Sequence, residues 1–348
     1  MGLNYIGSKH TLLDFIDKSV SKVVDKKNAK TFCDLFAGSG VVGEYFKKQG
    51  YSVISNDIQY YSYVINKNRI ANHKPLEFKG LITEIPRLKY DKDKMQVVCD
   101  YLNGLPAVRG FIYKNYSTGG SNRMYFTETN SMICDAIRQQ ITKWQSQHQI
   151  NAKEYWFLLC SLLESIDKYA NTASLYGAFL KQIKKSANKK YILQPSHFAH
   201  NKQTHKIYRQ DANKLAKIIK PDIVYLDPPY NHRQYSDNYH LLETIALYDN
   251  PKIKGITGMR EDRYKSLYCS RAKVLATFKD LIKNINAKYI FLSYNNEGLL
   301  THHQIENVMG SKGQYGVFSK TYKRYKADSQ RYNKSNITKE YLHYTICQ

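Results

Sequence analysis

The segment TFCDLFAGSGVVGEYFKKQGYSVISND, residues 31–57, decides the fold class. Residues 31–36 form a short apolar run that stops at the glycine-rich turn 37–40, and an amphipathic stretch follows. A second apolar run covers residues 51–55, and residues 60–71 again have helical spacing. Two strands joined through a helix form a βαβ unit, and the strands of such a unit are parallel. The segment therefore predicts an α/β protein with a parallel sheet.

Later segments extend the predicted sheet. Residues 222–226 and 288–294 read as two more buried strands, because both are nearly continuous apolar runs. The alternating patterns of residues 316–325 and 340–346 predict an antiparallel hairpin at the sheet edge. The result is a mixed, mainly parallel sheet with helices on both faces.

The stretch between the second predicted helix, which ends near residue 71, and the strand at residue 222 is predicted to contribute no further strand. Residues 131–144, 154–163 and 174–185 have helical spacing, whereas residues 108–126 are rich in glycine, tyrosine and arginine and predict a loop. Long irregular stretches on an α/β frame commonly carry specificity. We therefore divide the chain into a main domain and an inserted region, whose bounds are 1–77 with 151–348, and 78–150.

The charge of the chain predicts a polyanionic partner. The 348 residues include 53 Lys and Arg against 29 Asp and Glu, which leaves a net charge of +24. Residues 181–220 hold eleven basic side chains against one acid, and residues 311–340 hold eight against two. Such a field attracts phosphates, and the 31 tyrosines offer rings on which unpaired bases can stack. The alternative is a solvated surface kept soluble by lysine.

Several classes of protein are excluded by what the sequence lacks. No run approaches the roughly 18 apolar residues of a membrane span, and residues 1–15 lack the apolar core of a signal peptide, so we expect a cytoplasmic protein. The six cysteines form no CxxC pair, so reduced and mostly buried thiols are expected. The histidines have no metal-ligand spacing, and we predict no metal site.

The turn after the first strand predicts a nucleoside site. Gly38 and Gly40 allow the backbone to approach a ligand, and Asp57, at the tip of the second strand, can accept both ribose hydroxyls. Gly43 only approximates the third glycine of a dinucleotide pattern, and no Lys-Ser/Thr follows it. These residues favour a nucleoside without phosphates, such as S-adenosylmethionine. A plain βα turn is the alternative.

The Asp227-Pro228-Pro229-Tyr230 turn predicts a site for a planar exocyclic amine. Two prolines fix a rigid turn, so the Asp227 carboxylate and the Pro228 carbonyl can both act as acceptors in a cleft. An amine of this kind is a poor nucleophile, and accepting its two hydrogens favours attack by its nitrogen. Tyr230 offers a stacking face for a base that has left the duplex. The alternative is a structural strand terminator with a capping aspartate.

These motifs together resemble the D12, Dam-like class of DNA adenine-N6 methyltransferases in the α arrangement. The motifs, in chain order, are NYIGSK (4–9), DLFAGSG (34–40), NDI (56–58), QDA (210–212) and DPPY (227–230). The segments DPPYNHRQYSDNYHLLETIA and FLSYNNEG are similar to type II modification methylases of the NlaIII and FokI kind. The resemblance is secure over residues 1–72 and from about residue 150 to 348, and it is weaker over residues 78–130.

The resemblance implies a Rossmann-like class I S-adenosylmethionine-dependent methyltransferase fold, in which residues 78–150 are an inserted target-recognition region. It implies roles for individual residues as well. Cofactor binding would involve Tyr5, Ile6, Gly7, Lys9, Asp34, Phe36, Gly38, Gly40, Asp57, Ile58, Asp211 and Ala212, with Lys9 near the methionine carboxylate. Target-base binding would involve Asp227, Pro228, Pro229 and Tyr230. Without the family, residues 9–22 would be a capped amphipathic helix and Asp211 a helix N-cap.

The expected function is transfer of a methyl group from S-adenosylmethionine to adenine N6 in double-stranded DNA, as half of a restriction-modification system. The base would be flipped and N6 would attack the methyl group directly, without a covalent enzyme intermediate. The alternatives are an RNA methyltransferase acting on adenine N6 or guanine N2, and a catalytically silent DNA-binding subunit. We expect a monomer, with a cognate restriction endonuclease as a possible companion at the same site.

The predicted DNA contacts lie mainly in the loop of residues 108–123. A Gly-Gly segment there combines reach with charge and aromatic surface, although a mobile surface loop is the alternative. The candidates are Arg109, Tyr113, Lys114, Tyr116 and Arg123, together with His232 and Arg233 after the DPPY turn.

Overall fold

The computed structural model describes Leu3, residues 5–323 and residues 337–348. The chain divides into two compact units. Unit 1 comprises Met1–Ile6, Val64–His200 and Ser236–Arg263, and unit 2 comprises Gly7–Tyr63, Asn201–Tyr235 and Tyr264–Gln348. Two of the five boundaries fall within helices, α3 (Tyr60–Asn66) and α9 (Tyr235–Asn238). Four of the basic residues of the predicted second cluster, in the stretch 324–336, and Asn4 of the NYIGSK motif lie outside the described residues.

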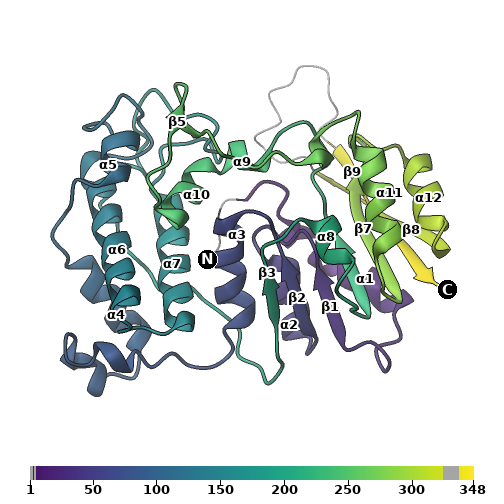
Figure 1. The fold of residues 1–348 in the computed structure, drawn as a ribbon, viewed down its shortest axis with the longest axis horizontal. Coiled ribbons are helices and arrows are strands. Elements are labelled where there is room, and N and C mark those ends of the chain that lie inside the picture. The colour runs from purple at the N-terminus through teal and green to yellow at the C-terminus, as the bar shows by residue number, and fades with distance from the viewer. Residues whose placement is uncertain (1–2, 4, 324–336) are drawn as a thin grey trace. The chain divides into compact units, whose positions relative to one another are not determined.

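Unit 2 is built on a seven-stranded sheet in the order β3-β2-β1-β4-β7-β9-β8, seen in Figure 1. The strands are β1 (Thr31–Asp34), β2 (Ser52–Asn56), β3 (Lys206–Tyr208), β4 (Ile223–Leu226), β7 (Tyr289–Asn295), β8 (Gly313–Lys323) and β9 (Ile337–Cys347). The first five strands in this order are parallel, and β9 is antiparallel to both of its neighbours. The predicted mixed sheet and its C-terminal hairpin are confirmed.

Helices cover both faces of this sheet. They are α1 (Leu13–Val23), which follows the 3-10 turn Lys9–Leu12, α2 (Val41–Lys48), α8 (Ala212–Ala216), α11 (Val274–Asn284) and α12 (His302–Gly310). On one face, Phe32 of β1 stacks on Phe46 of α2 with ring centroids 3.8 Å apart. On the other, Cys33 of β1 joins the core formed by α8, α11 and α12. Alternation along β1 thus sends successive side chains to opposite helical layers.

Unit 1 is mainly helical. Its elements are α4 (Lys94–Asn103), α5 (Phe111–Tyr116), α6 (Glu128–Ser146), α7 (Ala152–Lys168), α10 (His240–Leu247) and the two-stranded ribbon β5 (Ile253–Lys254) and β6 (Met259–Arg260). α6 and α7 run side by side (Figure 1). A capping box starts α7: the Asn151 side chain accepts the Glu154 N–H at 3.1 Å, and Glu154 accepts the Asn151 N–H at 2.9 Å.

Three predictions about the stretch before residue 222 are wrong. Residues 174–185 form turns and bends, because the Asn171 side chain accepts the Lys184 N–H at 3.0 Å and donates to the Leu180 carbonyl at 2.9 Å. The 108–126 stretch is not loop throughout, since it contains α5. The third wrong prediction is that this stretch contains no strand, because β3, with three residues, pairs with β2.

Helix α5 depends on a residue that lies far away in the sequence. The buried Asp135 carboxylate of α6 accepts the N–H groups of Gly110, Ile112 and Tyr113 at 3.1, 3.0 and 2.8 Å. These donors have no partner within a helix that begins at Phe111. Sequence patterns of residues 108–126 could not show this cap, because Asp135 is supplied by another helix.

The remaining expectations concern thiols, metals and membranes. Five cysteines are buried and Cys347 is half-buried, which confirms the predicted burial of the thiols, and all six are free. Among the described residues, no group of three or more His, Cys, Asp or Glu is arranged to hold a metal ion. Within the same residues, no helix is long and apolar enough to cross a membrane.

Candidate active site

The strand order places a switch point between β1 and β4. From β1 the chain continues to β2 and β3 on one side, whereas β4 and β7 lie on the other. Ligands of open α/β sheets bind at the carboxyl ends of strands at such a point. Here β1 ends at Asp34, and Asp227 directly follows β4.

The turn after β1 forms a backbone cradle. Gly38 and Gly40 have φ angles of 50° and 76°, which lie in the left-handed region that favours glycine. The Gly38 N–H donates to Asp57 Oδ2 at 2.9 Å, and Asp57 Oδ1 accepts the Gln59 N–H at 2.9 Å. Two backbone donors thus fix the Asp57 carboxylate beside the glycine turn, while burial raises its pKa above the usual value.

Asp34 is the least satisfied group of this region. Its side chain is buried, and within the described part of the chain its Oδ1 atom has no hydrogen-bond partner. Burial raises the pKa of Asp34 to about 8, and the negative charge of Asp227 adds to this effect. A buried acceptor without a donor is costly unless a ligand supplies one.

These residues fit S-adenosylmethionine. The unpartnered Asp34 oxygen can accept from the donor groups of a nucleoside ligand, and the glycine turn leaves the backbone open to it. The Asp57 carboxylate lies beside this turn, where it accepts the backbone N–H groups of Gly38 and Gln59. Carboxylate acceptors of this kind suit hydroxyl and amino groups rather than phosphate.

Asp227 is held by an ion pair. Lys9 Nζ lies 2.9 Å from Asp227 Oδ1, and the side chains are only 6% and 19% exposed. Burial raises the pKa of Asp227 to about 6, although the charge of Lys9 acts in the opposite direction. The carboxylate is thus poised near neutrality at a strand end, as catalytic groups commonly are.

Lys9 connects Asp227 to a second acid that the sequence did not reveal. Its Nζ atom lies 3.5 Å from Oε1 of Glu340, a buried residue of β9. Ser293 of β7 donates to the same Glu340 oxygen at 2.7 Å. Burial by itself would lower the pKa of Lys9, but Asp227 and Glu340 raise it well above the usual value. Ser293 lies in the FLSYNNEG segment, whereas no motif pointed to Glu340.

Tyr230 completes the turn after β4. Its ring lies edge-on to Tyr294 with centroids 6.2 Å apart, and Lys9 Nζ lies 6.0 Å from the Tyr230 ring centroid. The Leu299 N–H donates to the Tyr230 carbonyl at 3.0 Å. The ring is therefore positioned by β7 and the turn that follows it, while remaining only partly buried.

The NDI and QDA segments meet at the ends of β2 and β3. Asn56 donates to the carbonyls of Leu35 and Gln210, both at 3.1 Å, and accepts the Gln210 N–H at 3.0 Å. Asp211 accepts the Lys214 N–H at 3.1 Å and caps α8, which confirms the N-cap interpretation.

The other predicted cofactor residues surround this junction or belong to the N-terminal motif. Phe36 and Ile58 are half-buried, and Ala212 is buried. The NYIGSK motif is divided: Tyr5 and Ile6 belong to unit 1, where Tyr5 stacks on Tyr239 at 4.9 Å. Gly7 and Lys9 belong to unit 2.

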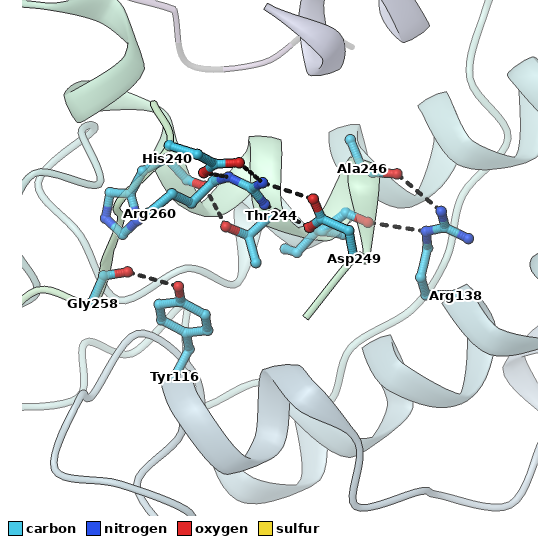
Figure 2. Close-up of polar contacts among 10 residues, drawn as sticks. Tyr116, Arg138, His240, Thr244, Ala246, Asp249, Gly258 and Arg260 are labelled. Atoms are coloured by element: carbon cyan, nitrogen blue, oxygen red, sulfur yellow. Dashed lines mark hydrogen bonds and ion pairs between the residues drawn. The ribbon is translucent and has the colours of Figure 1, made fainter. Parts of the chain in front are cut away.

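The predicted DNA contacts differ in their exposure. Arg109 and Lys114 are exposed, and the Arg109 guanidinium lies 5.4 Å from the centroid of the half-buried Tyr113 ring. Tyr116 is fully buried and its hydroxyl donates to the Gly258 carbonyl at 2.7 Å (Figure 2), so its ring is not available to stack on bases. The half-buried Arg123 donates to three backbone carbonyls.

Two more of the predicted DNA contacts follow the DPPY turn. His232 and Arg233 are exposed in unit 2. Their exposure leaves both side chains accessible to a polyanion.

The sheet order and the strand-end motifs define an S-adenosylmethionine-dependent methyltransferase. The model of the family described as "D12 class N6 adenine-specific DNA methyltransferase" matches residues 5–308. The chain belongs to this family.

Three relatives are similar over nearly the whole chain. Type II methyltransferase M.NlaIII of Neisseria lactamica is 45% identical over 98% of this chain and 98% of its own length. Type II methyltransferase M.CviAII of Paramecium bursaria Chlorella virus 1 is 37% identical over 99% of both chains. Type II methyltransferase M.FokI of Planomicrobium okeanokoites is 38% identical over 98% of this chain, which spans 52% of that protein. The chain is a site-specific DNA adenine methyltransferase.

Proposed function

We propose that this enzyme methylates one adenine within a specific double-stranded DNA sequence as the modification enzyme of a restriction-modification system. The observation that carries the proposal is the half-buried Asp227 carboxylate directly after β4, beside the end of β1 and paired with Lys9. The similar type II methyltransferases and the net charge of +24 support the DNA substrate and the modification role. A cognate restriction endonuclease would act on the same sequence, and the enzyme would work as a monomer in the cytoplasm.

The target adenine would be held by the turn after β4. The Asp227 carboxylate and the Pro228 carbonyl accept the two N6 hydrogens, and this favours the geometry in which the nitrogen lone pair can attack. Pro229 keeps the turn rigid, and Tyr230 stacks on the flipped base. When N6 gains its methyl group it must release a proton, and the Asp227 carboxylate, which would already bond to that amine, would accept it.

Lys9 and Glu340 would control the charge of Asp227. The Lys9 ammonium favours the ionised carboxylate against the effect of burial, and Glu340 holds the ammonium in place with support from Ser293. Because the carboxylate must be ionised to accept the proton that N6 releases, this arrangement keeps the site active near neutral pH. This role differs from the predicted contact of Lys9 with the methionine carboxylate. It is supported by the two carboxylates that the Lys9 ammonium already contacts, those of Asp227 and Glu340.

S-adenosylmethionine would occupy the carboxyl end of β1 and supply an electrophilic methyl group. Asp57 would accept the ribose hydroxyls, while Asp34 would accept a donor of the ligand with its free oxygen. The other proposed cofactor contacts are Tyr5, Ile6, Gly7, Phe36, Gly38, Gly40, Ile58, Asp211 and Ala212.

DNA would be bound by exposed basic and aromatic side chains of both units. Arg109, Tyr113 and Lys114 are the proposed contacts in the target-recognition region of residues 78–150, and His232 and Arg233 are those after the DPPY turn. Tyr116 is not a proposed contact, because its side chain is fully buried. For Arg123 we favour a structural role.

The test is modification sequencing and nucleoside mass spectrometry of DNA from cells that express this chain. We expect N6-methyladenine at one sequence context, and none with Asp227→Ala. Methylation of RNA alone, or of DNA at random adenines, would contradict the proposal. Equal methylation by the Asp227→Ala control would show that another enzyme produced the signal.

A further inference from the structure

A short segment of unit 2 connects the chain after the DPPY turn to the residues after β3. We call this segment, residues 264–269, the strap. The Gln234 side-chain amide donates to the Ser266 carbonyl at 3.2 Å and accepts the Ser266 N–H at 2.8 Å. The Cys269 thiol donates to the Arg233 carbonyl at 3.4 Å. The strap is therefore held at two points, Ser266 and Cys269.

Tyr268 anchors the strap in the core of unit 2. It is 5% exposed, and its ring lies edge-on to Phe36 with the ring centroids 5.2 Å apart. Its hydroxyl donates to the Asn213 side-chain oxygen of α8 at 2.7 Å. The Asn213 amide in turn donates to the Thr277 carbonyl of α11 at 2.9 Å. Because Phe36 is a proposed cofactor contact, these bonds fix the strap beside the cofactor site.

Tyr264, at the start of the strap, reaches the Asp211 carboxylate. Its hydroxyl donates to Asp211 Oδ2 at 3.2 Å, while Asp211 Oδ1 accepts the Lys214 N–H at 3.1 Å. The torsion that turns an aspartate carboxylate is soft, so one donor on each oxygen fixes a plane that a single bond would leave free to rotate. Partial burial and the negative charge of Asp211 raise the pKa of Tyr264 to about 12, and the hydroxyl therefore remains a donor at neutral pH.

Asp211 lies one strand beyond the proposed ribose contact. In the sheet order β3-β2-β1, Asp57 follows β2 and Asp211 follows β3. Neighbouring strands are about 4.8 Å apart, so the base of a nucleoside whose ribose is bound at Asp57 can reach Asp211. A carboxylate offers about four acceptor positions, more than the Tyr264 and Lys214 bonds occupy, and an exocyclic amine is a matching donor.

We propose that Tyr264 is a positioning residue that, through Asp211, makes the cofactor site specific for the amino group of the cofactor's purine. The inference rests on the proposed function, in which Asp211 is one of the contacts of S-adenosylmethionine. A site that hydrogen-bonds an amine rejects an analogue without it, because the acceptor of the site is then left unpaired. Such discrimination requires an oriented acceptor. Tyr264 orients the Asp211 carboxylate, and the anchored strap holds Tyr264 within reach of it.

The test is calorimetric titration with two ligands that cannot react. One is S-adenosylhomocysteine, and the other is the same molecule with hydrogen in place of the 6-amino group. The parent should bind the first about tenfold more tightly than the second, since a hydrogen bond to a charged acceptor is lost. Tyr264→Phe should bind S-adenosylhomocysteine about fivefold more weakly than the parent does, and the analogue within about twofold.

Two further variants give the experiment its controls. Tyr101→Phe makes the same chemical change elsewhere, because the Tyr101 hydroxyl donates to Glu84 Oε1 at 2.7 Å, and it should leave both affinities unchanged. Asp211→Asn removes the charge through which Tyr264 is proposed to act. Adding Tyr264→Phe to Asp211→Asn should therefore change the preference between the two ligands by less than about twofold.

The outcomes separate the role of Tyr264 from the function on which it depends. An unchanged preference in Tyr264→Phe, or an equal loss of affinity for both ligands, would overturn the proposal. The same loss in Tyr101→Phe would do so too, as would full additivity with Asp211→Asn. A parent that binds neither ligand would instead refute the proposed function. Removal of a hydroxyl from a side chain that is 37% exposed should leave the unfolding midpoint unchanged, and this is checked in parallel.

Discussion

The strand-end site of unit 2 and the β5–β6 hairpin of unit 1 both bury ionisable groups, but they satisfy the hydrogen-bonding atoms of these groups differently. Arg260 in the hairpin is 3% exposed and bonds to two carboxylates, and turn carbonyls beside it accept hydrogen bonds from Arg123 and Tyr116. Asp34 at the end of β1 is 1% exposed, yet one of its oxygens has no partner among the described residues. Satisfied groups hold a structure in place, whereas an unsatisfied one marks where a ligand is expected. The predictions below test this distinction.

The largest effect is expected for Asp227→Ala. Loss of an acceptor that acts as N6 changes its geometry should lower the methyl-transfer rate at least a hundredfold. Affinity for S-adenosylmethionine should change little, since Asp227 faces the target base in our proposal. Single-turnover methylation at saturating cofactor and calorimetric titration measure the two quantities. A normal transfer rate would remove Asp227 from the mechanism.

Asp57→Ala should weaken cofactor binding instead. A carboxylate that accepts two hydroxyl groups contributes about 1.5 to 3 kcal/mol, so affinity for S-adenosylmethionine should fall roughly ten- to a hundredfold. Asp222→Ala is the matched control, because Asp222 also accepts backbone N–H groups, from Lys30 and Thr31, both at 2.8 Å. If both variants bind the cofactor equally well, the role of Asp57 is only to hold its turn.

The pH dependence of the reaction should reveal the ionisation of Asp227. Burial raises its pKa to about 6, so the carboxylate is ionised above this pH and protonated below it. The protonated group cannot take the proton that N6 releases, and the single-turnover rate should fall about tenfold for each pH unit below about 6. Circular dichroism checks that the fold persists. A rate that stays level down to pH 5 would contradict the assignment.

The smallest effects are expected at the base of the hairpin. Arg260→Ala removes a buried guanidinium with several charged hydrogen bonds and should cost about 1 to 3 kcal/mol of unfolding free energy. Its partner carboxylates remain accessible to water, which limits the loss. Lys254→Ala, which breaks an exposed pair with Glu261 at 3.1 Å, should stay within about 0.5 kcal/mol. Urea unfolding of both variants measures the difference, and equal midpoints would show that burial does not distinguish the two pairs.

Local sequence patterns were sufficient to predict most strands of the sheet and the motifs at their ends. The runs at 31–36, 51–55, 222–226 and 288–294 each lie within two residues of an observed strand. This is because buried parallel strands must be apolar on both faces, and glycine or proline turns end them. Where the pattern was weak, prediction was wrong: β3 has only three residues, and α5 begins where a distant aspartate caps it.

The sequence by itself determined the fold class, the family and the order of the motifs, because these depend on residue types and on spacing along one chain. Only the tertiary structure decided which charges meet. Lys9, Asp227 and Glu340 come from the first turn, the end of β4 and the last strand, and no spacing connects them. The same holds for the hairpin, where Tyr116 and Arg123 are structural donors rather than exposed contacts. Hydrogen bonds and ion pairs act over a few ångströms of space, so partners far apart in the chain become visible only after folding.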